Sequence, residues 1–585
     1  MDVAEVLRVA EAWKKADPDP ATVRELAELL GKAEHAELTD RFAASLEFGT
    51  AGLRGVIGAG PNRMNRAVVR RTTAGLARYL KQQVPDVAKR GVVIGRDGRR
   101  MSPEFAEDAA RVLAAEGIPA LVFPDVVPTP VTSYAVLHTG AAAAVMVTAS
   151  HNPPEYNGYK VYWGNGAQIV PPHDKGIAEA IDRVEPANQV PLMELAEAKA
   201  KDLYRVIGPE LGQSYLEAIL ALRRHPGAAP DLKIVYTALH GVGGSWIEEA
   251  FLQAGFPGLQ TVVEQHEPDG SFPTVRFPNP EEPGAMDLAL ELAEEKGADL
   301  VLANDPDADR LAVAVRGEAG EHRMLSGNEI GVLLGHYLLT QTRPAPSKPL
   351  VITTIVSSPQ LGVIAKDLGA LYDETLTGFK WIANRAMERE RTEGANFVCG
   401  FEEALGYTVG TVARDKDGIG AALVFADLAS WCHARGVTVL GYLEEIQRRH
   451  GLFVARQVNF TFPGTEGAQV IKGIMDAFRK DPPSRIGQFA VEAVNDYQMG
   501  ERRTQQGVEK LTLPASNVIS YALEGGSRVT LRPSGTEPKI KYYFDLRENL
   551  GSDEPLQAAR MRAARSLDAL VNAFLALARD RGQPR

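Results

Sequence analysis

The chain has 585 residues, of which 45% are hydrophobic and 24% charged. This composition excludes a wholly disordered chain and, at about 100–200 residues per domain, predicts roughly three to five domains. The 64 basic and 75 acidic side chains give a net charge of −11 at pH 7. An acidic balance argues against nucleic acid as a partner, although it leaves room for a local basic pocket.

Cysteine content and the N-terminus indicate the compartment. Two cysteines, Cys399 and Cys432, are too few for a disulfide framework or a thiolate zinc site, and they fit a reducing compartment. The first residues carry early acidic side chains and a helical period of apolar positions, unlike a signal peptide. No apolar run reaches the ~18 residues that span a bilayer. We therefore expect a soluble, cytoplasmic protein with no membrane partner.

The first folding unit follows the N-terminal helical segment. Strands are expected at 91–97, 121–123 and 144–147, with a helix over 103–116 between the first two. Buried strands that alternate with helices are typical of a mostly parallel sheet covered by helices.

Two further units repeat this rhythm. Their strands are expected at 232–236, 259–263, 300–303, 349–354 and 396–399. Their helices are expected at 245–254, 286–296 and 361–368. Three similar units in succession suggest duplicated domains, although no tight sequence repeat is visible.

The last part of the chain has a different pattern. Strands are expected at 453–462, 516–523, 528–531 and 540–544, and a closing helix at 556–579. This order indicates an α+β domain. The predicted fold is therefore α/β: three consecutive mixed-sheet α/β domains and a C-terminal α+β domain around a central cleft. Its domains are expected at 1–205, 206–322, 323–452 and 453–585.

Ligands of open α/β sheets gather beyond the carboxyl ends of the strands, so the loops there are the candidates for chemistry. The first is the serine loop (148–153), Thr-Ala-Ser-His-Asn-Pro. Ser150 is a candidate nucleophile or phosphate carrier. A simple Ser/Asn turn is the alternative.

The second candidate is the aspartate loop (305–310), Asp-Pro-Asp-Ala-Asp-Arg, which directly follows an expected strand. Carboxylates at three alternate positions can converge on one hard cation, and all-oxygen ligation suits Mg²⁺. The alternative is a solvated acidic turn. The glycine and distal glutamate of a calcium-binding EF-hand are absent.

The third candidate is the glutamate loop (400–407), where Glu402 and Glu403 could accept hydrogen bonds from sugar hydroxyls. A charged turn is the alternative. The segments 377–380 and 414–418 could supply further groups to the same rim.

The fourth candidate is the phosphate loop (532–538), Arg-Pro-Ser-Gly-Thr-Glu-Pro. An arginine, two hydroxyls and free backbone N–H groups suit a phosphate, with a β-turn as the alternative. Arg54 lies in a glycine-rich loop, and Lys160 follows Ser150 closely enough to return to its site.

In this order the four loops resemble those of the α-D-phosphohexomutase superfamily, the phosphoglucomutases, phosphomannomutases and their relatives. The resemblance covers nearly the whole chain. The length and the Gly-Phe-Glu-Glu sequence look most like the long phosphoglucomutase branch, which includes phosphopentomutase-like members.

The resemblance implies a role for each loop. Ser150 would be the phosphoserine and, with Asp305, Asp307 and Asp309, would hold one Mg²⁺ per chain. The transferring phosphoryl group would be stabilised by Arg54, Lys160 and Arg310. His151 would hydrogen-bond locally, with proton transfer as the minority interpretation. The substrate would be bound by Thr377, Gly378, Glu402, Glu403, Lys416, Arg532, Ser534, Gly535 and Thr536.

The implied reaction interconverts glucose 1-phosphate and glucose 6-phosphate, with glucose 1,6-bisphosphate as intermediate and activator. Ala404 stands where the family usually has serine, which favours glucose or a pentose over mannose. Phosphomannomutase and phosphopentomutase activities by the same mechanism remain the alternatives. A phosphatase and a non-catalytic sugar-phosphate sensor are the rival hypotheses. The expected partner is a small sugar phosphate, and the chain is expected to be a monomer or a homodimer.

Overall fold

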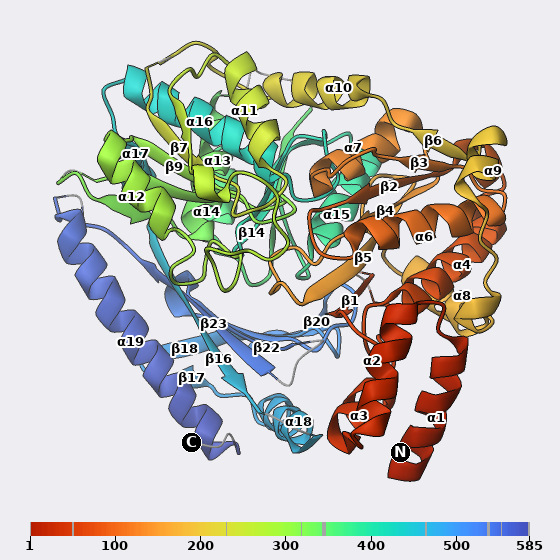
Figure 1. Ribbon diagram of the computed structural model, residues 1–585. Coiled ribbons are helices and arrows are strands. Elements are labelled where there is room, and N and C mark those ends of the chain that lie inside the picture. The colour runs from red at the N-terminus through yellow and green to blue at the C-terminus, as the bar shows by residue number, and fades with distance from the viewer. Residues whose placement is uncertain are drawn as a thin grey trace.

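The fold consists of four β-sheets with their helices, preceded by an N-terminal helical unit (Figure 1). The computed structural model describes residues 2–49, 52–229, 231–317, 319–341, 347–462, 465–534, 539–551 and 553–582. We call the parts built on the four sheets domains I to IV. The predicted fold class, three mixed-sheet α/β domains and a C-terminal α+β domain, is confirmed.

The N-terminal unit contains α1 (Val3–Ala16), α2 (Pro20–Gly31) and α3 (His35–Phe42). Aspartates cap the first two helices: Asp2 accepts from the Glu5 N–H, and Asp19 precedes a proline at the first helical position of α2. Such residues satisfy backbone groups that the helix leaves unpaired. The three helices share a small core, which consists of Val6, Ala10, Leu26, Leu38, Phe42 and Ala59.

Domain I has a six-stranded sheet in the order β1-β5-β4-β2-β3-β6, with β2, β3, β4 and β6 parallel and β1 and β5 antiparallel to their neighbours. Its strands are β1 (Leu53–Val56), β2 (Val92–Arg96), β3 (Ala120–Val122), β4 (Ala143–Val147), β5 (Tyr156–Trp163) and β6 (Tyr204–Val206). Its helices are α4 (Arg66–Gln83), α5 (Val87–Arg90), α6 (Ser102–Ala115), α7 (Thr129–Thr139), α8 (His173–Asp182) and α9 (Leu195–Ala200).

Domain II has a five-stranded sheet in the order β11-β10-β9-β7-β8, in which β7, β8 and β9 are parallel. Its strands are β7 (Ile234–Thr237), β8 (Leu259–Thr261), β9 (Leu300–Ala303), β10 (Ala312–Arg316) and β11 (His322–Met324). Its helices are α10 (Pro209–Leu220), α11 (Gly244–Gln253) and α12 (Asp287–Lys296).

Domain III has a four-stranded sheet in the order β13-β12-β14-β15, with only β15 antiparallel. Its strands are β12 (Pro349–Thr354), β13 (Leu371–Thr375), β14 (Asn396–Glu402) and β15 (Gly406–Val409). Its helices are α13 (Gly327–Gln341), α14 (Gln360–Asp367), α15 (Phe379–Glu393), α16 (Gly418–Ala434) and α17 (Val439–His450).

Domain IV is an antiparallel sheet covered by two helices, and it lies below the other domains in Figure 1. Its strands are β16 (Leu452–Thr461), β17 (Arg485–Ile486), β18 (Phe489–Asp496), β19 (Glu501–Thr504), β20 (Gly507–Lys510), β21 (Ile519–Leu523), β22 (Arg528–Pro533) and β23 (Lys539–Glu548). Its helices are α18 (Thr465–Lys480) and α19 (Leu556–Asp580).

A large hydrophobic cluster runs through domains I, II and III, because it contains buried side chains of all three sheets. Further buried side chains of domain I and of domain III form clusters of their own. Helix α16 lies within this cluster and is buried along nearly its whole length. Domain IV has its own cluster, formed by its sheet, α18 and α19. A smaller cluster joins domains III and IV through Val356, Leu376, Tyr497 and Tyr543.

The domain limits at 205, 322 and 452 stay predictions. In the structure these three positions lie in strands β6, β11 and β16. Among the helices that the structure describes, none combines the length and the apolar character needed to cross a bilayer.

Candidate active site

The serine loop follows β4 at the carboxyl end of the domain I sheet. Ser150 is 3% exposed and adopts a left-handed backbone conformation with φ 52°, which is unfavourable for a residue with a side chain. Its N–H donates to the Thr148 hydroxyl at 2.8 Å. Its own hydroxyl donates to Oδ2 of Asp305 in domain II at 2.8 Å, so the candidate nucleophile lies directly against the aspartate loop.

Arg99 holds the serine loop in this conformation. Its buried guanidinium donates to the carbonyl oxygens of Ser150, Asn152, Pro153 and Tyr156. The guanidinium also lies over the ring of Phe272, a domain II residue, with its central carbon 4.9 Å from the ring centroid. Four charge-assisted hydrogen bonds from one side chain offset the cost of the strained backbone.

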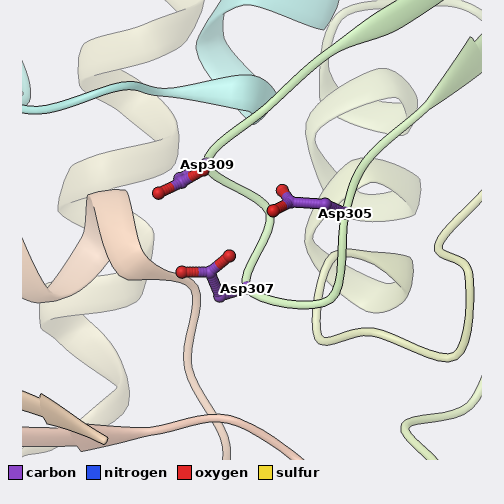
Figure 2. A group of neighbouring side chains, drawn as sticks. All are labelled: Asp305, Asp307 and Asp309. Atoms are coloured by element: carbon purple, nitrogen blue, oxygen red, sulfur yellow. The ribbon is translucent and has the colours of Figure 1, made fainter. Parts of the chain in front are cut away.

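The aspartate loop follows β9 and turns sharply at Ala308, where φ is 54°. The side chains of Asp305, Asp307 and Asp309 converge on one space, as Figure 2 shows, and each offers a carboxylate oxygen within 4.8 Å of the others. All three residues are fully buried. Domain I helps to position the loop, because the Thr129 hydroxyl donates to Oδ2 of Asp307 at 2.7 Å.

Two lysines neutralise part of this charge. The Lys160 ammonium donates to Oδ2 of Asp307 at 2.7 Å and to Oδ2 of Asp309 at 3.0 Å. Lys416, from domain III, lies 2.9 Å from the same oxygen of Asp309. Three domains therefore bring charged groups to one point.

The aspartates respond differently to their surroundings. Burial, together with the charges of Asp307 and Asp309, raises the pKa of Asp305 well above its usual range. Burial also disfavours ionised Asp307, but the Lys160 ammonium outweighs that effect and lowers the pKa of Asp307. Burial also disfavours the charged form of Lys416, but the Asp309 carboxylate outweighs that effect and raises the pKa of Lys416.

The donor set fits a magnesium ion. Oδ1 of Asp307 and Oδ1 of Asp309 are buried and accept no hydrogen bond from the residues that the structure describes. A buried carboxylate oxygen without a donor is costly unless a cation satisfies it. An all-oxygen set without histidine or cysteine suits a hard ion such as Mg²⁺.

Other predicted residues surround this centre. The Arg310 Nε lies 3.9 Å from Oδ2 of Asp305, and the Arg310 N–H donates to Oδ1 of Asp305 at 3.0 Å. Arg54 is exposed and donates to the side-chain oxygen of Asn152 at 3.0 Å. Burial lowers the pKa of His151 well below its usual value, and the charges of Arg310 and Arg54 act in the same direction.

The glutamate loop lies at the end of β14, at the same carboxyl edge as Thr377 and Gly378. Oε1 of Glu402 accepts the Gly378 N–H at 2.7 Å. Burial raises the pKa of Glu402, an effect that the nearby Lys416 charge opposes. Glu402 is thus linked electrostatically to the aspartate centre. Glu403 is bound elsewhere: its Oε2 accepts the Ser357 hydroxyl at 3.0 Å.

The phosphate loop begins with the last two residues of β22 in domain IV. Burial raises the pKa of Tyr543, an effect that the nearby Arg532 charge opposes, and the Ser534 N–H donates to the Lys539 carbonyl at 2.7 Å. Gly535 and Thr536 lie outside the described residues.

Sequence reasoning did not single out several residues that support the site. Arg99 follows β2 at the carboxyl edge, and Thr129 begins α7, so a search of all strand ends and helix starts could have found both. Asp415 accepts hydrogen bonds from Tyr162 and Gln168 of domain I at 2.7 Å each and thereby places Lys416. Only the assembled structure reveals this last contact.

Comparison with known proteins agrees with this arrangement. The chain matches the phosphoglucomutase/phosphomannomutase alpha/beta/alpha domain I over residues 45–188, domain II over 213–319 and domain III over 326–448. It is 38% identical to the phosphopentomutase of Homo sapiens over 586 residues, covering 96% of this chain and 94% of that protein. It is 37% identical to the glucose 1,6-bisphosphate synthase of Homo sapiens over 593 residues, covering 96% and 93%.

A solved structure shares the fold. The pp63/parafusin phosphoglucomutase from Paramecium superposes with a TM-score of 0.67 at 18% identity, covering 92% of this chain and 96% of that one. The matched domains, the relatives of similar length and the clustered aspartates lead to one conclusion: the chain belongs to the phosphoglucomutase/phosphomannomutase family, within the α-D-phosphohexomutase superfamily of magnesium-dependent mutases.

Proposed function

We propose that the protein is a phosphosugar mutase that interconverts glucose 1-phosphate and glucose 6-phosphate through phosphorylated Ser150 and glucose 1,6-bisphosphate. The observation that carries the proposal is the 2.8 Å contact between the Ser150 hydroxyl and Asp305, within a buried group of three aspartates and two lysines. Phosphoryl transfer depends mainly on positioning and charge neutralisation, and this centre supplies both.

In the first half-reaction, the bond between phosphorus and the Ser150 oxygen breaks as a sugar hydroxyl forms its own bond to the phosphorus, and the proton that the sugar hydroxyl loses ends on the released Ser150 oxygen. Lys160 and Arg310 approach the point of transfer from opposite domains and stabilise the negative charge on the phosphoryl oxygens. Arg54 lies beside the serine loop and can bind the same group.

In the second half-reaction, the other phosphate of the bisphosphorylated sugar returns to Ser150. The intermediate must therefore present each end in turn. Glu402 and Gly378 would hold the sugar hydroxyls, with Thr377 and Lys416 on the same rim, and the Arg532 and Ser534 segment would hold the phosphate that does not react.

Asp305, Asp307, Asp309 and the Ser150 oxygen would hold Mg²⁺, which when bound supplies positive charge that offsets the phosphoryl oxygens. The side chains Lys160 and Lys416 keep two of these carboxylates ionised and ready to ligate.

The sugar preference rests on two features. One relative of nearly full length is named for glucose 1,6-bisphosphate, which supports a glucose substrate. A second candidate is phosphopentomutase activity, which a relative of 38% identity carries in its name and which the missing hydroxyl at Ala404 favours. Pentose and mannose phosphates therefore belong in the same assay.

As further proposals, the protein acts in the cytoplasm, as a monomer or a homodimer.

The decisive experiment measures isomer formation and free phosphate release from glucose, mannose and ribose 1-phosphates, with catalytic glucose 1,6-bisphosphate and Mg²⁺. We expect isomerisation of glucose 1-phosphate without net phosphate release. Phosphate release without isomerisation would establish a phosphatase instead.

The Ser150→Ala variant provides the control. It should lose all turnover, yet still bind glucose 6-phosphate in calorimetry, because the sugar-binding and phosphate-binding groups remain. Full activity in this variant would exclude Ser150 as the phosphoryl carrier. Binding without turnover in the unmodified protein would indicate a sensor.

A further inference from the structure

Glu402 and Glu403 are adjacent in sequence but make separate sets of contacts. Glu402 contacts the Gly378 N–H, and its charge acts on Lys416 beside the aspartate loop. Glu403 instead accepts the hydroxyls of Ser357 at 3.0 Å and Thr354 at 3.4 Å. Strand β14 ends at Glu402, and Glu403 begins the turn that follows, so the two side chains have different neighbours.

Ser357 holds Glu403 from two directions. Its hydroxyl donates to the Glu403 carboxylate and accepts the Glu403 N–H at 3.2 Å. Ser357 itself is fully buried in the loop after β12. The side chain of Glu403 and its backbone are therefore both fixed to this one serine.

The other side of Ser357 is bound by domain IV. Its carbonyl oxygen accepts a hydrogen bond from the Arg528 guanidinium. The same guanidinium donates to Glu374 of domain III at 2.9 Å and to Asp545, its cross-strand neighbour on β23, at 3.3 Å. Burial disfavours the charged form of Arg528, but Glu374 and Asp545 outweigh it and raise the pKa of Arg528, so the guanidinium stays charged.

Arg528 is the first residue of β22, and Arg532 lies four residues further along the same strand. A paired β-strand is a stiff connection, because its backbone hydrogen bonds join it to both neighbours. The position of Arg528 against domain III thus sets the position of Arg532 relative to the glutamate loop.

We propose that Glu403, Ser357 and Arg528 form a bridge that fixes the distance between the glutamate loop and Arg532 of β22, and that Glu403 is a positioning residue and does not contact the sugar. The bridge deepens the proposed function and rests on it, since it assigns Glu402 alone to the sugar. A fixed distance between Arg532 and the glutamate loop would favour the binding of sugar phosphates whose length matches that distance.

The test is a double-mutant cycle on KM for glucose 1-phosphate, with Glu403→Gln, Arg528→Lys and their combination. Each single change should raise KM about tenfold, and the double change should raise it about tenfold as well, because both break one bridge. The matched control pairs Arg528→Lys with Glu402→Gln, whose effects should multiply to about a hundredfold. Multiplying effects for Glu403→Gln and Arg528→Lys would overturn the bridge.

A second measurement does not depend on activity. Cys399 and Cys432 are buried, so spin labels can be placed selectively on exposed Thr392→Cys in domain III and Ala569→Cys in domain IV. The distribution of distances between the labels should broaden in Glu403→Gln and Arg528→Lys and stay narrow in Glu402→Gln. An unchanged width in the first two variants would also overturn the bridge.

If Arg528→Lys fails to fold, Ser357→Ala replaces it. Ser358→Ala is then the neighbouring control, because the Ser358 hydroxyl accepts the Gln360 N–H and takes no part in the bridge. An unmodified protein that isomerises no sugar phosphate would refute the proposed function, and the label distances would still decide whether the bridge exists.

Discussion

The hydroxyl of Thr129, at the start of α7 in domain I, donates to Oδ2 of Asp307 in domain II at 2.7 Å. The Thr129 N–H also donates to the Asp307 carbonyl at 2.9 Å. The orientation of this carboxylate therefore depends on the contact between two domains. Groups that orient a ligating carboxylate commonly contribute to metal affinity.

We expect Thr129→Val to raise the Mg²⁺ concentration needed for half-maximal activity by about 10- to 100-fold, because Asp307 loses the donor that orients it. Titration of a chelator-treated enzyme with Mg²⁺ measures this. Thr132→Val is the control, since the Thr132 hydroxyl on the same helix faces the Met146 sulfur. Equal Mg²⁺ requirements in the two variants would contradict the prediction.

Arg99→Lys should lower kcat by about 10- to 100-fold with little change in KM, because a lysine cannot bind four carbonyls at once and the serine loop would relax. Steady-state kinetics separates the two constants. Arg90→Lys serves as the matched control, because Arg90 binds the carbonyls of Gly140 and Ala141 at the opposite end of β4. A change in KM alone would assign Arg99 to substrate binding.

Gly327→Ala should destabilise the protein by about 1–3 kcal/mol and raise KM, since a Cβ there would lie 1.9 Å from the Glu403 carbonyl oxygen and displace the glutamate loop. Thermal unfolding and kinetics measure both effects. Gly473→Ala, where a Cβ meets open space within α18, should instead stabilise by about 0.5–1 kcal/mol. Unchanged KM in Gly327→Ala would show that the loop tolerates the shift.

Stability should fall as the pH falls from 6.5 to 4, in part because of His336. Burial lowers its pKa to about 4, and the neighbouring His450 and Arg449 charges act in the same direction. The unfolded chain then binds the proton that the folded protein excludes, which costs about 2–3 kcal/mol across this window. His336→Gln should flatten the dependence of the unfolding free energy on pH, whereas His35→Gln on the exposed face of α3 should not.

Much of the fold was predictable because the buried strands of domains I to III are short apolar runs next to helical patterns. The 300–303 strand and the helix over 286–296 appear as β9 and, shortened by one residue, α12. Helix α16 was not predicted, because it is apolar on every side and has no helical period. The β18–β20 meander was also missed: β19 and β20 are short and largely polar, and β18 is only partly buried.

The centre of the site was predictable for a different reason. Ser150 and Asp305 each follow a strand, and the carboxyl ends of strands converge in this type of fold. The separate contacts of Glu402 and Glu403 were not predictable, because they depend on residues far away in sequence. Ser357 lies 46 residues from Glu403, and Arg528 lies 171 residues from Ser357. Long-range contacts of this kind leave no local pattern.

The continuous core of domains I to III has a consequence for cooperativity. Because one apolar cluster joins three sheets, removing any one of them would expose the other two, and the three should unfold as a single unit. Domain IV, with its own core and a smaller junction, can lose its structure separately. We therefore expect domain IV, which carries Arg532 and Ser534, to unfold in a step separate from domains I to III.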